Sequence, residues 1–167
     1  MLSTRTDALL IEITSHLKGL TDQCNPFSTK LAKEIIEKSL KIKIDDVFEE
    51  FEDIPLAAAS LAQVHRAKLK NTSERVVIKV LRPSIHRRVK RNVRVMKAGG
   101  FLINLFYKES DRLKLKDVID DYEKTIFKEL DLKVEAANTT VTKKNFANSE
   151  LLFIPKVFWD QTTPDVL

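Results

Sequence analysis

Residues 76–81 read VVIKVL, a strand-like run in which Lys79 is the one charged side chain. Successive side chains of a β-strand point to opposite faces, so Lys79 shares a face with Val77 and Leu81. Both faces are otherwise apolar, which predicts a strand that is covered on both sides. Because an unpaired buried ammonium is costly, Lys79 must reach an anion or solvent. A lysine that binds nucleotide phosphates is one hypothesis, and an edge-strand lysine that discourages aggregation is the alternative.

The segments around this run predict a mixed α and β architecture. Residues 61–69 also have strand-like content, and the polar stretch 70–74 between the two runs predicts a β-hairpin. Residues 151–158 read as a further strand. A break or thinning is expected at Gly99-Gly100, and another near Leu130. Apolar residues at helical spacing predict helices at about residues 6–20, 28–40, 46–51, 85 onward and 115–146.

Small side chains fill the segment before the hairpin, where residues 55–65 read PLAAASLAQVH. Loops that bind phosphate need small side chains, because backbone N–H groups must approach the phosphate oxygens. Alanine is small but disfavours a positive φ, so an alanine loop must hold phosphates differently from a glycine loop. The alternative is a packing position between a helix and the sheet, or a short helix.

Three carboxylates lie within seven residues further along the chain, where residues 127–138 read FKELDLKVEAAN. On an ideal helix Glu129 shares a face neither with Asp131 nor with Glu135. We therefore expect one of the three to pair with Lys79 while another points elsewhere. The alternative is solvated charge on an amphipathic helix.

Composition excludes several classes of protein. The chain has 167 residues, a formal net charge of +5, three glycines and one cysteine. The three glycines, Gly19, Gly99 and Gly100, are placed so that neither a Gly-x-Gly-x-x-Gly loop nor a Walker loop can be formed. One cysteine excludes an intrachain disulfide and a cysteine-based zinc site. The longest uncharged runs, residues 54–65 and 98–107, are shorter than the roughly 20 residues that a membrane-spanning helix needs.

Positive charge is concentrated between Glu74 and Glu109, where ten basic and no acidic residues occur. Subtracting these ten charges from +5 leaves −5 for the rest of the chain. Much of the segment belongs to the helix predicted from residue 85. This pattern is typical of a membrane-surface or nucleic-acid face, and the alternative is an ordinary solvated face. We do not expect a nucleic-acid partner, since no aromatic side chains are interleaved to stack on bases. The candidate anion-binding residues are Arg87, Arg88, Lys90, Arg91, Arg94 and Lys97.

Together, the alanine-rich segment, the lysine strand and the acidic segment resemble the amino-terminal part of the UbiB/ADCK family of atypical kinase-like proteins. The matching stretches are residues 55–65, 76–83, 122–138, 145–146 and 154–157. The chain is most similar to bacterial members that are needed for ubiquinone biosynthesis. The resemblance implies an α+β fold with a protein-kinase-like amino-terminal lobe, a small antiparallel sheet with helices, over residues 53–167. A helical extension over residues 1–52 would precede it.

The resemblance also implies an ATP site of an atypical kinase or ATPase. Glu135 is implied as the helix partner of Lys79, and Glu129 with Asp131 as the Glu-x-Asp motif of the family. Mg²⁺ is expected in full-length members. The residues implied to contact the nucleotide are Lys79 and, in place of a glycine loop, Ala57, Ala58, Ala59 and Ser60.

The chain also departs from the family pattern. In relatives a Lys-x-Gly-Gln motif stands immediately before the stretch that matches residues 1–5. No catalytic-loop Asp followed by a metal-binding Asn, and no Asp-Phe-Gly-like motif, occurs among the 167 residues. Phosphoryl transfer needs those metal ligands. We therefore expect the carboxy-terminal lobe to be absent and the chain to be inactive alone.

Partners follow from the resemblance and from the uncovered surface. Family members are associated with membranes, which implies a cytoplasmic protein held peripherally at the inner membrane beside quinone-biosynthesis proteins. The alternative is a non-enzymatic module that uses residues 82–97 on an anionic membrane or a partner chain. Half of a kinase-like fold leaves apolar surface uncovered, so we also expect self-association.

Overall fold

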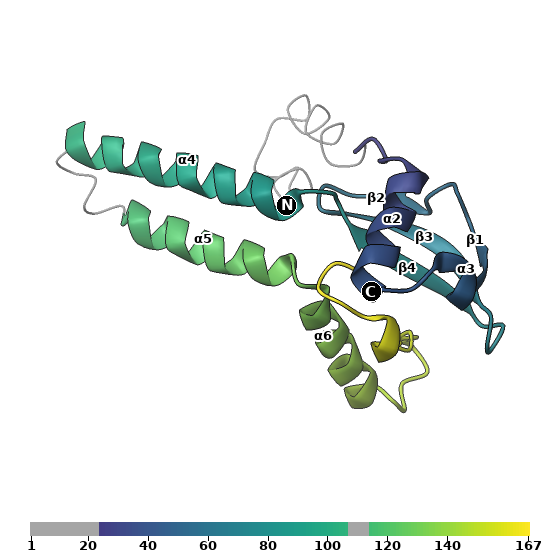
Figure 1. Ribbon diagram of the computed structural model, residues 1–167. Helices are drawn as coiled ribbons and strands as arrows, with labels where there is room; N and C mark the ends of the chain where they lie inside the picture. Colours follow the sequence, from purple (N-terminus) through teal and green to yellow (C-terminus); the bar gives the residue numbers. More distant parts are fainter. Residues whose placement is uncertain (1–23, 107–113) are drawn as a thin grey trace, which may run out of the picture.

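A computed structural model describes residues 24–106 and 114–167 of the chain (Figure 1). A small antiparallel sheet carries helices, which confirms the predicted α+β lobe. The helix predicted at about residues 6–20 lies outside the described residues. Within the described part, no helix is both long enough and apolar enough to cross a bilayer.

The predicted hairpin is the centre of the four-stranded sheet. Strand β3 (Ala62–Leu69) pairs antiparallel with β4 (Arg75–Leu81) on one edge. On its other edge β3 pairs with two short strands, β1 (Phe48–Phe51) near one end and β2 (Ala57–Ala58) near the other. The register sets Val64 opposite Lys79 and Arg66 opposite Val77. Opposite residues of an antiparallel pair share a face, so these four side chains lie on one side of the hairpin.

The free edge of β4 is occupied by the last residues of the chain. The Lys79 N–H donates to the carbonyl of Leu167 at 2.6 Å, and the Leu167 N–H donates back to Lys79 at 2.9 Å. Val80 and Val166 form an antiparallel bridge beside them. Both backbone hydrogen bonds of Lys79 therefore go to Leu167, while β4 pairs with β3 on its other edge, so Lys79 does not lie on a free edge strand.

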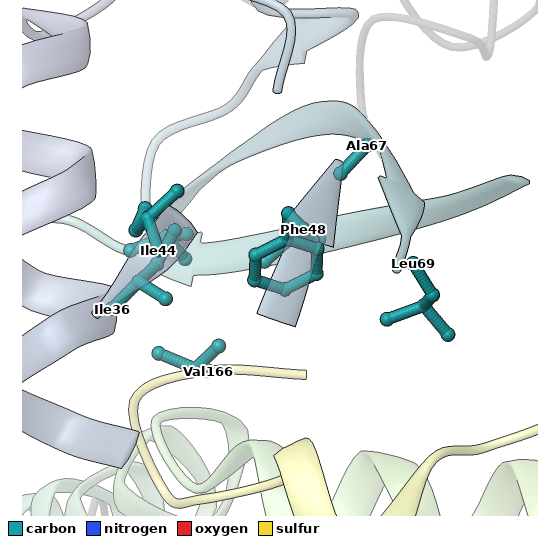
Figure 2. Close-up of a cluster of buried hydrophobic side chains, with 8 residues drawn as sticks. Ile36, Ile44, Phe48, Ala67, Leu69 and Val166 are labelled. Carbon is teal, nitrogen blue, oxygen red and sulfur yellow. The ribbon is translucent and has the colours of Figure 1, made fainter. Parts of the chain in front are cut away.

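One face of the hairpin is sealed by helix α2 (Thr29–Leu40) and the short helix α3 (Ile44–Val47). The Ser28 side chain caps α2 by accepting from the Leu31 N–H, as its position before an apolar stripe predicts. Figure 2 shows Ile36, Ile44, Phe48 and Val166 converging under the sheet. This cluster is one of two buried apolar cores, and the second lies between the end of β4, α4, α5 and the start of α6.

Two polar side chains are also fully buried on the covered face. The Gln63 amide accepts from the Phe27 N–H at 3.0 Å and donates to the Phe27 carbonyl at 3.2 Å. Its second N–H lies 2.8 Å from His65 Nε2, and His65 Nδ1 lies 2.9 Å from the carbonyl of Glu52. The amide donates to Nε2, so the ring carries its proton on Nδ1 and donates to Glu52. Phe51 stacks on the ring at 4.9 Å.

Helix α4 (Ile85–Phe106) and helix α5 (Leu115–Glu129) project side by side away from the sheet (Figure 1). The expected break at Gly99-Gly100 is absent, since α4 is continuous there. A Cβ on Gly100 would meet Ile119 Cδ1 at 3.1 Å, so glycine lets α5 pack closely. The interruption expected near Leu130 is confirmed, because α6 (Leu132–Asn145) starts anew after it.

Two secondary-structure predictions are wrong. The acidic helix predicted for residues 46–51 ends with α3, and Phe48–Phe51 form β1, because Phe48 enters the core and the backbone pairs with β3. The strand predicted for residues 151–158 is irregular chain, followed by a 3-10 turn, η3 (Trp159–Gln161). Leu151 and Phe153 are almost fully exposed there, so no alternating burial holds a strand.

Candidate functional site

Lys79 and Glu135 form an ion pair that joins β4 to α6. The Lys79 Nζ lies 2.8 Å from Oε1 and 2.6 Å from Oε2 of Glu135. The two residues are 56 positions apart in the sequence. About a third of the lysine side chain and 44% of the glutamate side chain remain exposed, so solvent screens the pair and a ligand can reach it.

The start of α6 is fixed so that Glu135 faces the sheet. Asp131 caps the helix, since its carboxylate accepts from the Lys133 N–H at 3.0 Å. The Leu132 N–H donates to the carbonyl of Pro164 at 2.9 Å. Leu132 and Ala136 are buried on either side of Glu135 in sequence, which sets the helix rotation. Asp131 therefore holds α6 in place, while Glu129 ends α5 on a different element.

A cavity of about 760 Å³ opens beside the ion pair. Lys79 and all three carboxylates of the acidic segment line it, so the fold gathers Glu129, Asp131 and Glu135 around one lysine. Thr139 and Thr142 add hydroxyl groups, because positions four and seven residues after Glu135 fall on the same helix face. That spacing was visible in the sequence, but these two threonines were not predicted.

A smaller cavity of about 230 Å³ adjoins the first along the edge of β4. The two cavities share Lys79 and Glu135 in their linings. The smaller one is also lined by Val64, Val77 and Leu167. A cavity lined largely by apolar side chains therefore lies directly next to the Lys79–Glu135 ion pair.

The alanine-rich segment forms a tight β-hairpin rather than an open loop. Ala57 and Ala58 pair with Val64 and Gln63, and the Ala59 N–H closes the turn on the carbonyl of Ala62 at 2.8 Å. The cavity is lined by Leu61 and Ala62 from the end of this turn. None of the four predicted nucleotide-contact residues lines the cavity. These residues are Ala57, Ala58, Ala59 and Ser60.

Arg82 fixes this hairpin, although it was predicted only as part of the 82–97 face and not at the nucleotide site. Its Nε donates to the carbonyl of Ala59 at 2.8 Å, and its Nη2 donates to the carbonyl of Asn25 at 3.0 Å. Its own N–H donates to the carbonyl of Leu61 at 2.8 Å. Within the described residues, the N–H groups of Ser60 and Leu61 donate to no backbone acceptor. The tip of the hairpin thus keeps two donors available while Arg82 holds its position.

The predicted basic face is divided by the structure. All six of its residues are exposed on α4, and five of them form no ion pair with α5 within the described residues, namely Arg87, Arg88, Lys90, Arg91 and Arg94. Lys97 instead faces α5, where its Nζ lies 2.5 Å from Glu123 and 3.0 Å from Asp120. Hydrogen bonds to Glu123 and Asp120 raise the pKa of Lys97, and the same ammonium lowers the pKa of Asp120.

Metal ligands do not gather at the site. Across residues 24–106 and 114–167, no group of three or more His, Cys, Asp or Glu side chains is arranged to hold a metal ion. The three carboxylates that line the cavity therefore do not form a three-ligand metal site.

Comparison with known proteins shows which family and which sequences this chain resembles. Residues 19–167 match the ABC1 atypical kinase-like domain. Over all 167 residues the chain is 42% identical to proteins named "Probable protein kinase UbiB" from Azotobacter vinelandii, Marinobacter nauticus and Aeromonas hydrophila. It spans only 30 to 31% of the length of these curated relatives. The family resemblance drawn from the motifs is confirmed.

A solved structure supports the fold alone. The complex of Rv3197 with erythromycin from Mycobacterium tuberculosis superposes with a TM-score of 0.73 at 22% sequence identity. The superposition covers 99% of this chain and 41% of that one.

Proposed function

This chain belongs to the ABC1 atypical kinase-like domain family, and on that premise we propose that the cavity beside Lys79 binds the phosphates of ATP. The observation that carries the proposal is the Lys79–Glu135 pair at the wall of a cavity of about 760 Å³. Ligand sites for small molecules have volumes of about 300–1,000 Å³. The proposal concerns how the residues of this chain bind ATP and position its phosphates.

The charge arrangement fits a phosphate group. A lysine ammonium has three N–H donors, and the two contacts to Glu135 leave one for a further acceptor. Glu135 holds the ammonium at the cavity wall, so Lys79 needs little reorganisation when an anion arrives. A hydrogen bond to a charged group contributes about 1.5–3 kcal/mol, which makes this contact the strongest that the site offers.

The alanine hairpin supplies neutral donors. The N–H groups of Ser60 and Leu61 are at a turn, and Leu61 lines the cavity. Backbone N–H groups at such turns bind phosphate oxygens in many proteins, and small side chains let the ligand approach. Arg82 keeps the turn in place through the carbonyl of Ala59. These contacts require no positive φ, and no residue of the turn has one.

The neighbouring apolar cavity fits the base. Val64, Val77 and Leu167 line it next to Lys79, and Val77 is half exposed on a sheet face where an apolar side chain is otherwise unexpected. A planar base lying there would cover that surface while its phosphates extend toward the lysine. ATP, when bound, supplies a transferable phosphoryl group. Within the described residues no three side chains are arranged to hold a metal ion, and we assign no step to a metal.

The wider role that we propose is a kinase-like or ATPase activity in ubiquinone biosynthesis. What supports it is the 42% identity to proteins named UbiB. The chain spans less than a third of the length of those proteins. That a phosphoryl group passes to an acceptor, and that other proteins take part, are therefore proposals as well.

A series of ligands with increasing phosphate content tests the site. Binding of adenosine, AMP, ADP and ATP to the purified chain is measured by isothermal titration calorimetry. Affinity is expected to rise with each phosphate that reaches Lys79, by about tenfold or more between adenosine and ATP. Equal affinity for adenosine and ATP, or no binding of either, would overturn the proposal. Repeating the series at higher salt gives an internal control, because only the phosphate contribution falls with screening.

A further inference from the structure

The edge of β4 that faces away from β3 is paired along only part of its length. Near the end of the strand, the N–H and C=O groups of Lys79 both bond to Leu167. The backbone groups of alternate residues in a strand point to the same edge, so those of Val77 and Arg75 point there too. Within the described residues, no backbone group bonds to either of them on this edge. The first half of β4 therefore presents two N–H and two C=O groups that can pair with a further strand.

A cavity of about 790 Å³ lies beside this unpaired edge. Arg75 and Val77 line it, together with Phe153 of the irregular segment before η3. Lys79 and Glu135 do not line it, so it lies outside the ion pair of the proposed nucleotide site. The Phe153 side chain is 93% exposed, and large apolar side chains at such exposure mark a surface that meets a partner. Unpaired backbone and exposed apolar surface thus meet at one cavity.

Charged side chains line the same cavity, and several of them neutralise one another. The Arg66 guanidinium lies 3.6 Å from the Glu52 carboxylate, and the Lys68 ammonium lies 2.8 Å from Glu49. A hydrogen bond to Glu49 raises the pKa of Lys68, and the negative charges of Glu49 and Glu50 add to this effect. This part of the cavity therefore has little charge to offer a ligand.

Arg75 and Lys156 are the remaining basic residues of the lining. Within the described residues, neither of them forms an ion pair with a carboxylate. The Lys156 ammonium lies 4.7 Å from the centre of the Phe158 ring, a contact that leaves its charge uncompensated. The nearby carboxylate of Glu74 accepts instead from the Thr72 hydroxyl at 3.1 Å. The cavity therefore offers two cations to an incoming carboxylate.

We infer that the unpaired half of the β4 edge binds an extended peptide of a partner protein, in which an apolar residue precedes an acidic residue by two positions. The peptide lies antiparallel to β4, as residues 165–167 do further along the same edge. Its apolar residue lies opposite Val77 and beside Phe153, and its acidic residue lies opposite Arg75. Alternate side chains share a face, so both of them point into the cavity. In strand addition, main-chain hydrogen bonds give affinity and alternate side chains give specificity.

Two other ligands fit this edge less well. A second copy of the chain, paired edge to edge, would bring two Arg75 side chains together on one face, where like charges repel. A free phosphate would meet the cations but leave the backbone groups and Phe153 without a partner. An extended peptide with an apolar and an acidic residue satisfies the backbone, the apolar surface and the cations at once.

Fluorescence polarisation with labelled peptides and the 167-residue chain tests this inference. The probe is an end-blocked peptide of sequence Thr-Thr-Val-Thr-Glu-Thr-Thr, and its control carries Lys in place of Glu. We expect the Glu peptide to bind about tenfold more tightly than the Lys peptide at about 0.01 M ionic strength. The difference should shrink at about 1 M, where charges are screened. No binding of the Glu peptide, or equal binding of both peptides, would overturn the inference.

Methylation of single peptide nitrogens tests the backbone pairing. The amide N–H groups of Val and Glu in the probe are those that point at β4, so methylating both should abolish binding. The Thr between them has its N–H on the other edge, so its methylation is the matched control and should leave the affinity nearly unchanged. Equal losses in the two methylated peptides would overturn the pairing with β4.

Substitutions in the chain test the two cations. Arg75→Gln with Lys156→Gln should lower the affinity for the Glu peptide by about tenfold. The matched control is Lys143→Gln with Lys144→Gln, which removes two exposed lysines of α6 and should have a much smaller effect. Arg75→Glu should reverse the preference, so that the Lys peptide binds more tightly. Equal losses in the two double variants, or an unchanged preference in Arg75→Glu, would overturn the assigned contacts.

Two further measurements identify the occupant and separate this site from the nucleotide site. In analytical ultracentrifugation, the Glu peptide should leave the oligomeric state of the chain unchanged. A dimer that the peptide dissociates would show that a second copy occupies the edge and would overturn the inference. Lys79→Met should leave the peptide affinity unchanged, so failure of this inference and failure of the nucleotide proposal are distinguishable.

Discussion

The two faces of the β3–β4 hairpin are built from the same alternating sequence but have opposite roles. On the covered face, Gln63, His65 and Val80 are fully inaccessible to solvent and Ile78 is nearly so. On the open face, the side chains of Val64, Arg66, Val77 and Lys79 stay half-buried or exposed. The covered face closes on α2 along its length. The open face is closed only at one end, where Ala62 and Leu81 are buried in a cluster with Leu130 and Leu132, and beside Glu135 it leaves cavities.

The difference between the faces shows how one strand can serve both stability and binding. Burial on the covered face holds β4 in place, so Lys79 is presented from a fixed backbone. Open surface on the other face leaves the lysine accessible to an anion. Substitutions on the covered face should therefore change the free energy of unfolding, and substitutions on the open face should change ligand affinity.

The largest expected effect is on the covered face, at Ile36 of α2. Ile36 is fully buried, and Ile36→Ala should lower the free energy of unfolding by about 2–5 kcal/mol. Val77→Ala on the open face is the control and should change it by no more than about 0.5 kcal/mol. Urea unfolding measures both. Similar losses in the two variants would erase the distinction between the faces.

The next largest effect on stability is expected from removing a buried polar side chain of the covered face. Gln63→Leu keeps the side-chain size but removes the hydrogen bonds to Phe27 and His65. Leaving those buried groups unpaired should cost about 1–3 kcal/mol in urea unfolding. Arg66→Gln, one of the exposed positions of the open face, is the comparison and should be close to neutral. If Gln63→Leu left the free energy of unfolding unchanged, the buried hydrogen bonds of Gln63 would not stabilise the lobe.

A smaller effect is expected at Arg82, directly after the end of β4. Arg82→Lys keeps the positive charge but loses the planar fork that reaches the carbonyls of Ala59 and Asn25. Stability should fall by about 1 kcal/mol, and ATP affinity should fall with it because the hairpin tip is no longer fixed. Arg87→Lys, an exposed arginine on α4, should change neither quantity. Unchanged ATP affinity in Arg82→Lys would separate the alanine hairpin from the site.

The smallest effect is expected outside both faces, at Lys97. Its pKa is raised by Glu123 and Asp120, so its stabilising contribution is present below the unfolded value of about 10.4 and is lost as pH rises through the folded pKa. The pKa of Asp120 is lowered by Lys97, so its contribution is present above about 3.9 and is lost as pH falls through the folded pKa. The melting temperatures of the parent chain and Lys97→Met should therefore differ by a small, constant amount at intermediate pH. This difference should shrink at both extremes.

Lys90→Met is the matched control for that measurement. Lys90 is exposed on the same helix, and within the described residues it has no carboxylate partner. It should show no such pH window. A window of equal size in both variants would mean that the pairing across α4 and α5 adds nothing to stability.

The sequence predicted the parts of the fold that one-sided burial creates. Apolar spacing located α2, the β3–β4 hairpin and the split near Leu130, because in each case buried positions repeat with the period of the element. Periodicity does not report pairing between distant segments. β2 consists of two alanines, which have little strand preference, and it exists because it pairs with β3. The chain end that completes β4 at Val166 was missed for the same reason.

The candidate site was predictable only in part. Lys79 stood out because a charge interrupts an apolar run, but spacing alone could not choose among Glu129, Asp131 and Glu135. The choice depends on how α6 is rotated, which Leu132, Ala136 and the Pro164 contact determine. The family resemblance supplied Glu135, and the structure places its carboxylate on Lys79. It gave no indication of Arg82, whose side chain binds backbone carbonyls and so leaves no pattern in the sequence.

The central claim is that Lys79, held by Glu135 on the open face, binds nucleotide phosphate. Titration calorimetry with ATP on the parent chain, Lys79→Met and Lys133→Met tests it most directly. Lys133 is an exposed lysine of α6 outside both cavity linings, so it controls for the loss of one positive charge. The account predicts that Lys79→Met weakens ATP binding by about ten- to hundredfold while Lys133→Met leaves it nearly unchanged. Equal affinities in all three proteins, or equal losses in both variants, would contradict it.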